Sequence, residues 1–310
     1  MRDLSLTSDL REGGSWTPLQ RAKNDAIWTL ACLALAGTRL LPLAAMRLLG
    51  RTLGAAAHLL ARRQRRTALE NVALAFPELG AHEQRALVRR SFSTLGELLG
   101  ETVASLRPRG GPAALAVSED ARAVLAVARA EGRGVLFPSA HLGPWERVAS
   151  SLVEAGIPLV TLARESYDPR FSRLYDRLRG ARGVGVVWRS SPGAAARILR
   201  TLRAGRVLGV PMDLRSRVTT CAAPFLGHPA QTAVGPARIA LRTRAPVVVG
   251  TAAPGEGDGW IVTATRIPTG DLGASNEDAA ELTARINGEL SRRIRAMPHA
   301  WVWMHDRWAA

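Results

Sequence analysis

The sequence predicts an α/β protein with a mostly parallel central sheet flanked by helices and with an apolar, helical N-terminal region. Two observations carry this fold class. From about residue 118 onward, short apolar segments alternate with stretches of helical periodicity, and several of the helical stretches begin at a capping residue or a proline. Strands that alternate with helices at this spacing form βαβ units, in which the strands run parallel. The 310 residues are enough to bury a sizeable core.

Three regions are expected along the chain. Residues 1–25 are polar and contain Gly13, Gly14 and Pro18, so we expect a flexible leader. Residues 26–66 are expected to form an apolar and basic helical segment that associates with a membrane. Residues 67–310 are expected to form the α/β domain.

The apolar part of the second region, residues 26–46, is uninterrupted for about 13 residues, short of the roughly 20 that a helix needs to span a bilayer. It is therefore expected either to be buried or to lie in the membrane interface as a monotopic anchor. The arginines that follow it favour the anchor, because they would meet anionic lipid head groups: Arg47, Arg51, Arg62, Arg63, Arg65 and Arg66. A solvated basic helix face is the alternative.

The later elements follow from periodicity and from helix-start residues. Apolar residues recur at three- and four-residue steps over residues 83–106, which indicates a helix. Ser118 can cap a helix over 119–131, and Asp168 and Pro169 supply the cap and first turn of another. Further helices are expected over 191–204, 235–244 and 277–296, and strands at 134–137, 157–163, 184–188, 206–212, 247–252 and 260–266.

The charge is strongly basic, with 42 Lys plus Arg against 26 Asp plus Glu and a net charge of +16. Lys23 is the only lysine, and arginine binds phosphate and carboxylate in bidentate fashion, so nucleic acid, an anionic membrane or a phosphorylated substrate would suit it. A GC-biased coding sequence explains the arginines equally well. No helix-turn-helix, RNP or zinc-finger signature is present, which disfavours a nucleic-acid-binding protein. Cys32 and Cys221 lie far apart, and no metal or cofactor is expected.

Candidate catalytic residues follow the predicted strand at 134–137. His141 lies in the loop, and Gly143 and Pro144 lead into a helix whose first turn contains Glu146. In open α/β sheets, reactive groups gather where strands end and helices begin. Glu146 could accept the Nδ1 hydrogen of His141 and leave Nε2 free to take a proton from a hydroxyl. The alternative is an incidental loop histidine beside a capping glutamate.

The string His141-x4-Glu146 resembles the HX4(D/E) motif of the bacterial lipid A biosynthesis lauroyl and myristoyl acyltransferases, and of the related phosphatidylinositol mannoside acyltransferases. The resemblance runs from about residue 26 to residue 308, and other family segments match in the same order. They are an N…FPE segment at 71–78, a helix at 97–102, Arg164 before Asp168-Pro169, a strand-ending aspartate at Asp213, a PFLGHPAQT loop at 224–232 and a W-x-H-x-R tail at 303–307. Pro144, Leu226 and Asp306 depart from the family pattern, and Asp213 lacks the usual following Gln; these changes flank the implied acid/base pair.

The resemblance implies a membrane-associated O-acyltransferase of lipopolysaccharide biosynthesis at the cytoplasmic face of the bacterial inner membrane. The donor would be an acyl carrier protein or coenzyme A thioester. The acceptor would be a glycolipid hydroxyl, such as one on a lipid A precursor, with phosphatidylinositol mannoside or another lipid as the alternative. His141 and Glu146 would form the catalytic dyad. No Gly-x-Ser-x-Gly elbow or zinc-ligand spacing supports a hydrolase instead.

The resemblance also implies a set of substrate-binding residues: Arg164, Asp213, Gly143, Trp145, His305 and Arg307. Arg164 or the backbone N–H groups near residues 142–143 would stabilise the oxyanion, although Arg164 could instead bind a phosphate or pair with Glu165 or Asp168. Asp213 is expected to assist Arg164 or to act as a turn cap. The aromatic tail around Trp301 and Trp303 could lie at the membrane interface, but packing as the last core element is preferred.

Overall fold

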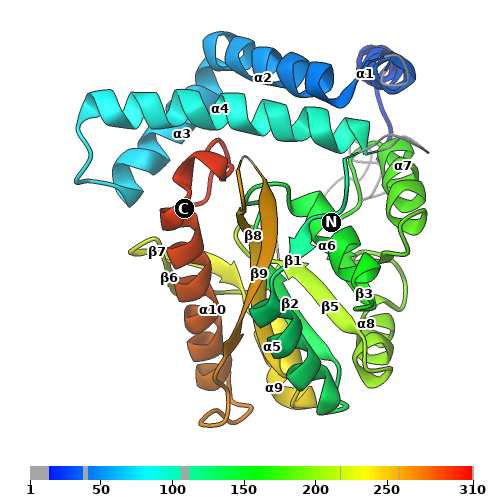
Figure 1. Ribbon diagram of the computed structural model, residues 1–310, viewed down its shortest axis with the longest axis vertical. Helices are drawn as coiled ribbons and strands as arrows, with labels where there is room; N and C mark the ends of the chain where they lie inside the picture. The colour runs from blue at the N-terminus through cyan, green and yellow to red at the C-terminus, as the bar shows by residue number, and fades with distance from the viewer. Residues whose placement is uncertain (1–13, 38–40, 106–111, 217, 258, 309–310) are drawn as a thin grey trace.

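The computed structural model describes residues 14–37, 41–105, 112–216, 218–257 and 259–308. Its centre is a seven-stranded sheet with the order β1-β9-β8-β2-β5-β3-β4 and with helices on both faces (Figure 1). All neighbouring strands are parallel except β8 and β9. The predicted α/β class with a mostly parallel sheet is therefore confirmed. The strands are β1 (Ala116–Val117), β2 (Val135–Ser139), β3 (Leu159–Ala163), β4 (Gly185–Trp188), β5 (Val207–Pro211), β8 (Val247–Pro254) and β9 (Trp260–Ile267).

The helices agree with the capping pattern of the sequence. The Ser118 hydroxyl accepts a hydrogen bond from the Ala121 N–H, and Asp168 accepts one from the Arg170 N–H, so both predicted caps are present. The helices are α1 (Pro18–Gly37), α2 (Leu43–Leu60), α3 (Arg62–Ala75), α4 (Ala81–Ala104), α5 (Glu119–Ala130), α6 (Trp145–Glu154), α7 (Pro169–Gly180), α8 (Ala194–Arg203), α9 (Gly235–Thr243) and α10 (Asn276–Ala296).

The start of α1 corrects the expected leader, because residues 18–25 are helical. Thr17 and Gln20 form a capping box: the Gln20 N–H donates to the Thr17 hydroxyl, and the Thr17 N–H donates to the Gln20 side chain. Pro18 therefore begins a helix rather than breaking one. The rest of the expected leader, up to residue 13, lies outside the described residues. None of the helices in the described part of the chain combines the length and the apolar character needed to cross a membrane.

A separate hairpin of β6 (Thr220–Phe225) and β7 (His228–Ala233) occupies the segment that the sequence suggested to be a loop. Its prolines, Pro224 and Pro229, stand opposite each other and obscured the strand pattern. The turn residues Leu226 and Gly227 both have positive φ, 51° and 93°, as a two-residue hairpin turn requires.

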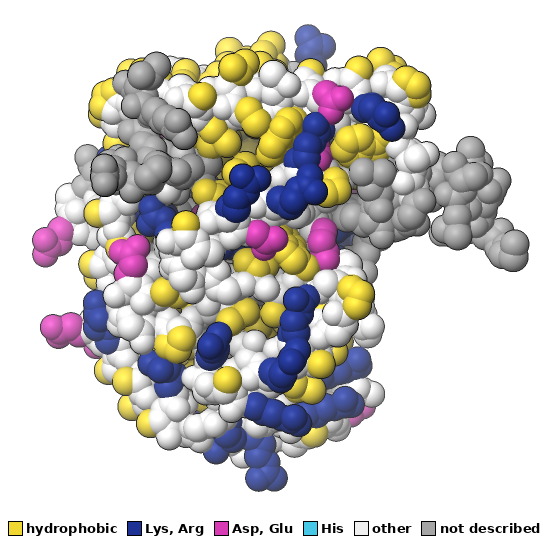
Figure 2. All heavy atoms as spheres, turned by 90° about the vertical axis from the view of Figure 1, so that its right-hand side faces the viewer, with side chains coloured by type: hydrophobic (Ala, Val, Ile, Leu, Met, Phe, Trp, Pro, Cys, Tyr) yellow, Lys and Arg dark blue, Asp and Glu magenta, His cyan; other side chains and the backbone are white. Residues whose placement is uncertain are grey.

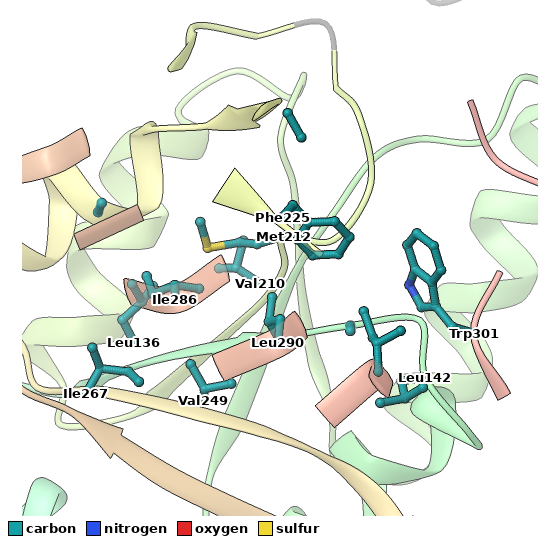
Figure 3. Close-up of a cluster of buried hydrophobic side chains, with 14 of the residues drawn as sticks. Leu136, Leu142, Val210, Met212, Phe225, Val249, Ile267, Ile286, Leu290 and Trp301 are labelled. Carbon is teal, nitrogen blue, oxygen red and sulfur yellow. The ribbon is translucent and has the colours of Figure 1, made fainter. Parts of the chain in front are cut away.

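The central sheet is buried on both faces, and alternate residues of each strand face different cores. Leu136 and Leu208 belong to the cluster under α8, α9 and α10, whereas Val135 and Val207 belong to the cluster under α5 and α6. Figure 3 shows part of the first cluster, where Trp301 of the C-terminal tail lies near Leu142 and Phe225. Because both faces are apolar, the carboxyl ends of the strands are the place for polar chemistry.

Candidate active site

His141 and Asp213 are brought together by the register of β2 and β5. These parallel strands pair from Val135 with Val207 to Ser139 with Pro211, and the Met212 N–H continues the ladder by donating to the Ser139 carbonyl at 3.0 Å. His141 and Asp213 each lie two residues beyond the last paired position. They therefore face each other at the carboxyl edge of the sheet, where α/β proteins place their ligand sites.

The Asp213 carboxylate is fully buried and accepts three hydrogen bonds. Its Oδ1 lies 2.9 Å from His141 Nδ1. Its Oδ2 accepts from the His141 main-chain N–H at 2.8 Å and from the Trp301 indole Nε1–H at 2.9 Å. The imidazole is 27% exposed, and among the described residues its ring is hydrogen-bonded only through Nδ1. Asp213 thus fixes the ring, and Nε2 is left for a substrate.

The pKa values of the pair shift in opposite directions. Burial alone would raise the pKa of Asp213, but the charge and hydrogen bonds of His141 and the Trp301 N–H hold it below its usual range. Burial alone would lower the pKa of His141, but the charge and hydrogen bond of Asp213, with a smaller contribution from Glu146, raise it above 6.5. Asp213 therefore stays ionised and stabilises the imidazolium form of His141.

Glu146 lies in the first turn of α6 as expected, but it does not contact the His141 ring. Its carboxylate accepts from Arg179 of α7, with Arg179 Nη2 at 2.8 Å from Oε1 and 3.1 Å from Oε2. The expectation that Glu146 accepts the Nδ1 hydrogen is wrong, because the strand register places Asp213 at that nitrogen. Glu146 acts on His141 through its charge, and its ion pair joins α6 to α7.

Gly143 and Trp145 border the histidine. Gly143 has a φ of 60°, and a Cβ atom there would lie 2.7 Å from the Trp260 ring, so only glycine fits without displacement. Its N–H donates to the Ala300 carbonyl at 3.0 Å, so this N–H is not an available oxyanion donor. The Trp145 ring lies 5.4 Å from the His141 ring and forms one wall beside it.

Arg164 follows the last residue of β3 and is exposed. Strand β3 pairs with β5 from Leu159 with Val207 to Thr161 with Gly209, so Arg164 lies at the same carboxyl edge of the sheet as Asp213. Asp213 does not pair with Arg164, contrary to expectation, because its two oxygens are bound by His141 and Trp301. Arg164 makes no ion pair within the described residues, and Asp168 pairs with Arg170 at 2.7 Å. The Arg164 guanidinium is therefore available to bind an anionic group of a ligand.

The C-terminal tail packs as the last core element, as preferred from the sequence, with Trp301 and Trp303 fully buried. Arg307 is also buried: its Nη1 donates to the Gln231 carbonyl and its Nη2 to the Thr232 hydroxyl, both at 2.7 Å. Burial lowers the pKa of Arg307 to about 10. Arg307 thus lies in the protein interior and joins the tail to β7.

His305 lies close enough to Asp213 and His141 for their charges to act on it. Burial is the larger effect and lowers its pKa, and its Nδ1 is buried without a hydrogen-bond partner in the described structure. Burial therefore favours the neutral form of the His305 imidazole. Asn71 Nδ2 donates to the carbonyls of Trp303 and His305 at 2.8 and 2.7 Å, so the N-terminal motif of the sequence holds the C-terminal motif in place.

Two residues of this arrangement, Trp301 and Arg179, were not predicted from the sequence. A signal for the Asp213 partnership was present: His141 is six residues after the first residue of β2, and Asp213 is six residues after the first residue of β5. No local pattern indicates that Arg179 meets Glu146, since 33 residues separate them. Among the described residues, no group of three or more His, Cys, Asp and Glu side chains could hold a metal ion.

The chain was also compared with known proteins. A comparison with curated protein sequences finds no significant match. The family model described as bacterial lipid A biosynthesis acyltransferase matches residues 18–310, which include every element of the site. The family acts through an acyl donor and a lipid acceptor. The chain is therefore an acyltransferase and belongs to the bacterial lipid A biosynthesis acyltransferase family.

Proposed function

We propose that this protein is a membrane-associated O-acyltransferase that transfers a fatty acyl chain from an acyl thioester to a hydroxyl of a glycolipid, such as a lipid A precursor. The observation that carries the proposal is the contact of His141 with the buried carboxylate of Asp213 at 2.9 Å. A histidine that is fixed through Nδ1 and exposed elsewhere is suited to general base catalysis. The donor would be an acyl carrier protein or coenzyme A thioester.

In the proposed reaction, His141 Nε2 removes the proton of the acceptor hydroxyl while its oxygen attacks the thioester carbonyl carbon. The carbonyl electrons move to oxygen and give a tetrahedral oxyanion. When the intermediate collapses, the C–S bond breaks, and the leaving thiolate is protonated by the His141 imidazolium. Asp213 stabilises the imidazolium between these steps, and an ester and a free thiol are the products. Glu146 supports the positive charge from a greater distance.

The oxyanion requires hydrogen-bond donors. Because the Gly143 N–H is engaged by Ala300, we assign the oxyanion or a substrate phosphate to Arg164, which follows the strand beside β5. Trp145 would contact the substrate next to His141. In this proposal the buried Arg307 holds the C-terminal tail against β7 rather than binding substrate, and the half-buried His305 contacts substrate beside His141.

The membrane part of the proposal is supported by the unusual orientation of α2. Its glycines face the protein: Gly50 and Gly54 pack on Gly96 and Gly100 of α4, where the backbones approach so closely that a Cβ atom on Gly50 would overlap the Gly96 carbonyl. Its leucines face outward. The outward-facing leucines of α2 are Leu48, Leu49, Leu53, Leu59 and Leu60, between 45% and 81% exposed.

Helix α1 extends the same apolar surface with exposed Ile27, Leu30 and Leu33, and both helices lie along one end of the molecule (Figure 1). An exposed apolar patch of this kind marks an interaction site, and exposed Arg51, Arg62 and Arg63 beside it would suit anionic lipid. We therefore propose that α1 and α2 lie in the interface of the cytoplasmic leaflet as a peripheral anchor.

The test is a transfer assay with purified protein in detergent, radiolabelled acyl thioester, and separate acceptors: an acyl-deficient lipid A precursor and a phosphatidylinositol mannoside. Transfer to one of them, lost in His141→Gln and retained in the remote His82→Gln, is expected. Mass spectrometry of lipids from a deletion strain, with one acyl chain missing, would identify the natural acceptor. Undiminished transfer by His141→Gln would refute the assignment of the base.

A further inference from the structure

One edge of the central sheet carries a concentration of positive charge, most of which the proposed reaction does not use. Residues 169–206 contain ten arginines and one acidic residue, Asp176, so this segment supplies more than half of the net charge of +16. The segment forms α7, the edge strand β4 and α8, and both helices contact β4. Arg170, Arg179 and Arg182 pair with carboxylates outside the segment, and the other seven arginines are gathered around this single edge.

Many of these arginines point outward. Arg173 and Arg177 are exposed and are four residues apart on α7, and Arg200 and Arg203 are exposed and three apart on α8, so each pair lies on one face of its helix. Asp176 accepts a hydrogen bond from the Trp188 indole at 3.0 Å. Figure 2 looks onto this side of the molecule and shows Lys and Arg side chains spread over its lower half, with few acidic side chains among them.

We propose that this basic edge, formed by α7, β4 and α8, is the docking surface for an acidic acyl carrier protein that delivers the acyl donor. The proposal rests on the proposed acyl transfer function and names the partner of that site. Complementary charge would steer an acidic carrier to the edge and fix its orientation.

An anionic membrane fits this edge less well than an acidic protein does. Peripheral membrane surfaces combine basic residues with apolar side chains that insert into the lipid. Within residues 169–206, no large hydrophobic side chain of the described structure is among the strongly exposed ones, whereas α1 and α2 contain most of them. In Figure 1, α8 lies far from α1 and α2, toward the other end of the molecule. Helix α7 adjoins α1, through the ion pair of Arg170 with Asp25 and the ring contact of Phe171 with Trp28, so the basic edge starts beside the apolar surface and extends away from it along β4 and α8.

The size of the basic edge favours a protein over a nucleotide-linked donor. Helix α7 has 12 residues and α8 has 10, so they extend about 18 Å and 15 Å, and their exposed arginines are spread along both. The few phosphates of coenzyme A could contact only a small part of this surface. An acidic helical protein could contact arginines on both helices at the same time.

The basic edge also borders the proposed reaction centre. Arg179 of α7 binds Glu146, whose charge acts on His141, and α7 follows directly on the carboxyl end of β3 and Arg164. A carrier docked on α7 would therefore lie beside the carboxyl edge of the sheet. The flexible arm of the carrier, which bears the acyl thioester, would then have to cross only the carboxyl edge of the sheet to reach His141.

The decisive variant is Arg177→Glu/Arg200→Glu/Arg203→Glu. The matched control is Arg85→Glu/Arg89→Glu/Arg242→Glu, which makes the same charge change at exposed positions of α4 and α9. Full-length proteins in detergent would be assayed with lauroyl, myristoyl and palmitoyl thioesters of acyl carrier protein and of coenzyme A. For the first variant we expect KM for the acyl carrier protein to rise about tenfold or more, from loss of exposed charge pairs, with kcat and the KM for acyl coenzyme A unchanged.

Binding of fluorescently labelled, unacylated carrier protein measures docking without chemistry. Wild type should bind it with strong salt dependence, the control should bind equally, and the first variant should lose binding. The corresponding Arg→Gln triple variant, with circular dichroism, checks that the result does not come from misfolding. If carrier binding is intact in the first variant, or both donors are affected equally, the docking proposal is wrong. If wild type binds the carrier but transfers no acyl group from either donor, the proposed function fails instead.

Discussion

Trp301 donates its indole N–H to Asp213 Oδ2 at 2.9 Å, across 88 residues of sequence. The same oxygen accepts the His141 main-chain N–H, so the buried carboxylate cannot rotate without losing one of these bonds. The Ser91 hydroxyl of α4 donates a hydrogen bond to the main-chain carbonyl of Trp301 at 2.9 Å, which fixes Trp301 against α4. Trp301 is therefore a positioning residue for the carboxylate that orients the proposed base.

Replacing Trp301 by Phe removes this donor while keeping an aromatic ring. We expect kcat to fall about ten- to hundredfold, the effect of one hydrogen bond to a charged group, with KM within about twofold. Steady-state kinetics would measure both constants. Trp303→Phe is the matched control, because the Trp303 indole donates to the Pro298 carbonyl and not to Asp213. Equal losses of kcat in the two variants would mean that Trp301 serves packing alone.

The roles of the two carboxylates can be separated by Asp213→Asn and Glu146→Gln. Asp213 contacts the imidazole directly, so its replacement should reduce kcat/KM by about 10³- to 10⁴-fold, as loss of an orienting carboxylate does in hydrolytic triads. Glu146→Gln keeps hydrogen-bond acceptance from Arg179 and should cost less, about tenfold. Kinetics of both variants in the same preparation would decide. A larger loss in Glu146→Gln would restore the glutamate as the direct partner of His141.

This division between Asp213 and Glu146 shows where sequence reasoning reached its limit. The His141-x4-Glu146 spacing is local and visible, whereas the meeting of His141 with Asp213 depends on two strands 72 residues apart. The helices that begin at Ser118 and Asp168 were predictable because their caps are local. The β6–β7 hairpin was not, because its prolines oppose the usual strand pattern.

The pH dependence of transfer should report the raised pKa of His141. A general base must be unprotonated, so kcat/KM should fall as the pH drops through this pKa, which lies above 6.5. In Asp213→Asn, burial still lowers the pKa of His141, but the main effect that raises it is gone. The acidic limb of the profile should therefore move to lower pH, while the maximum falls. If the acidic limb of the kcat/KM profile has the same midpoint in Asp213→Asn as in wild type, a group other than His141 controls it.

The glycine contact between α2 and α4 should be intolerant of side chains. A Cβ atom on Gly50 would overlap the Gly96 carbonyl, so Gly50→Ala should force the helices apart and lower the free energy of unfolding by about 1–3 kcal/mol. Gly288→Ala in α10 is the control, because no atom lies within 4 Å of its added Cβ and helix propensity should make it neutral or stabilising. Denaturant unfolding would compare them. Equal stability of the two variants would contradict such close packing of the helices.

The outward leucines of α2 should control membrane association separately from catalysis. Leu48, Leu53 and Leu60 are 61–81% exposed, so the triple change to Gln removes little core packing but a large part of the proposed lipid-facing surface. We expect sedimentation with vesicles of phosphatidylethanolamine and phosphatidylglycerol to fall at least about tenfold, since each buried leucine contributes about 1.5–3 kcal/mol. Transfer to a short-chain, detergent-dispersed acceptor should persist, because His141 and Asp213 lie elsewhere. Val127→Gln on α5, exposed to 60% but distant from α2, should sediment like wild type. Unchanged sedimentation of the triple variant would remove α2 from the membrane interface.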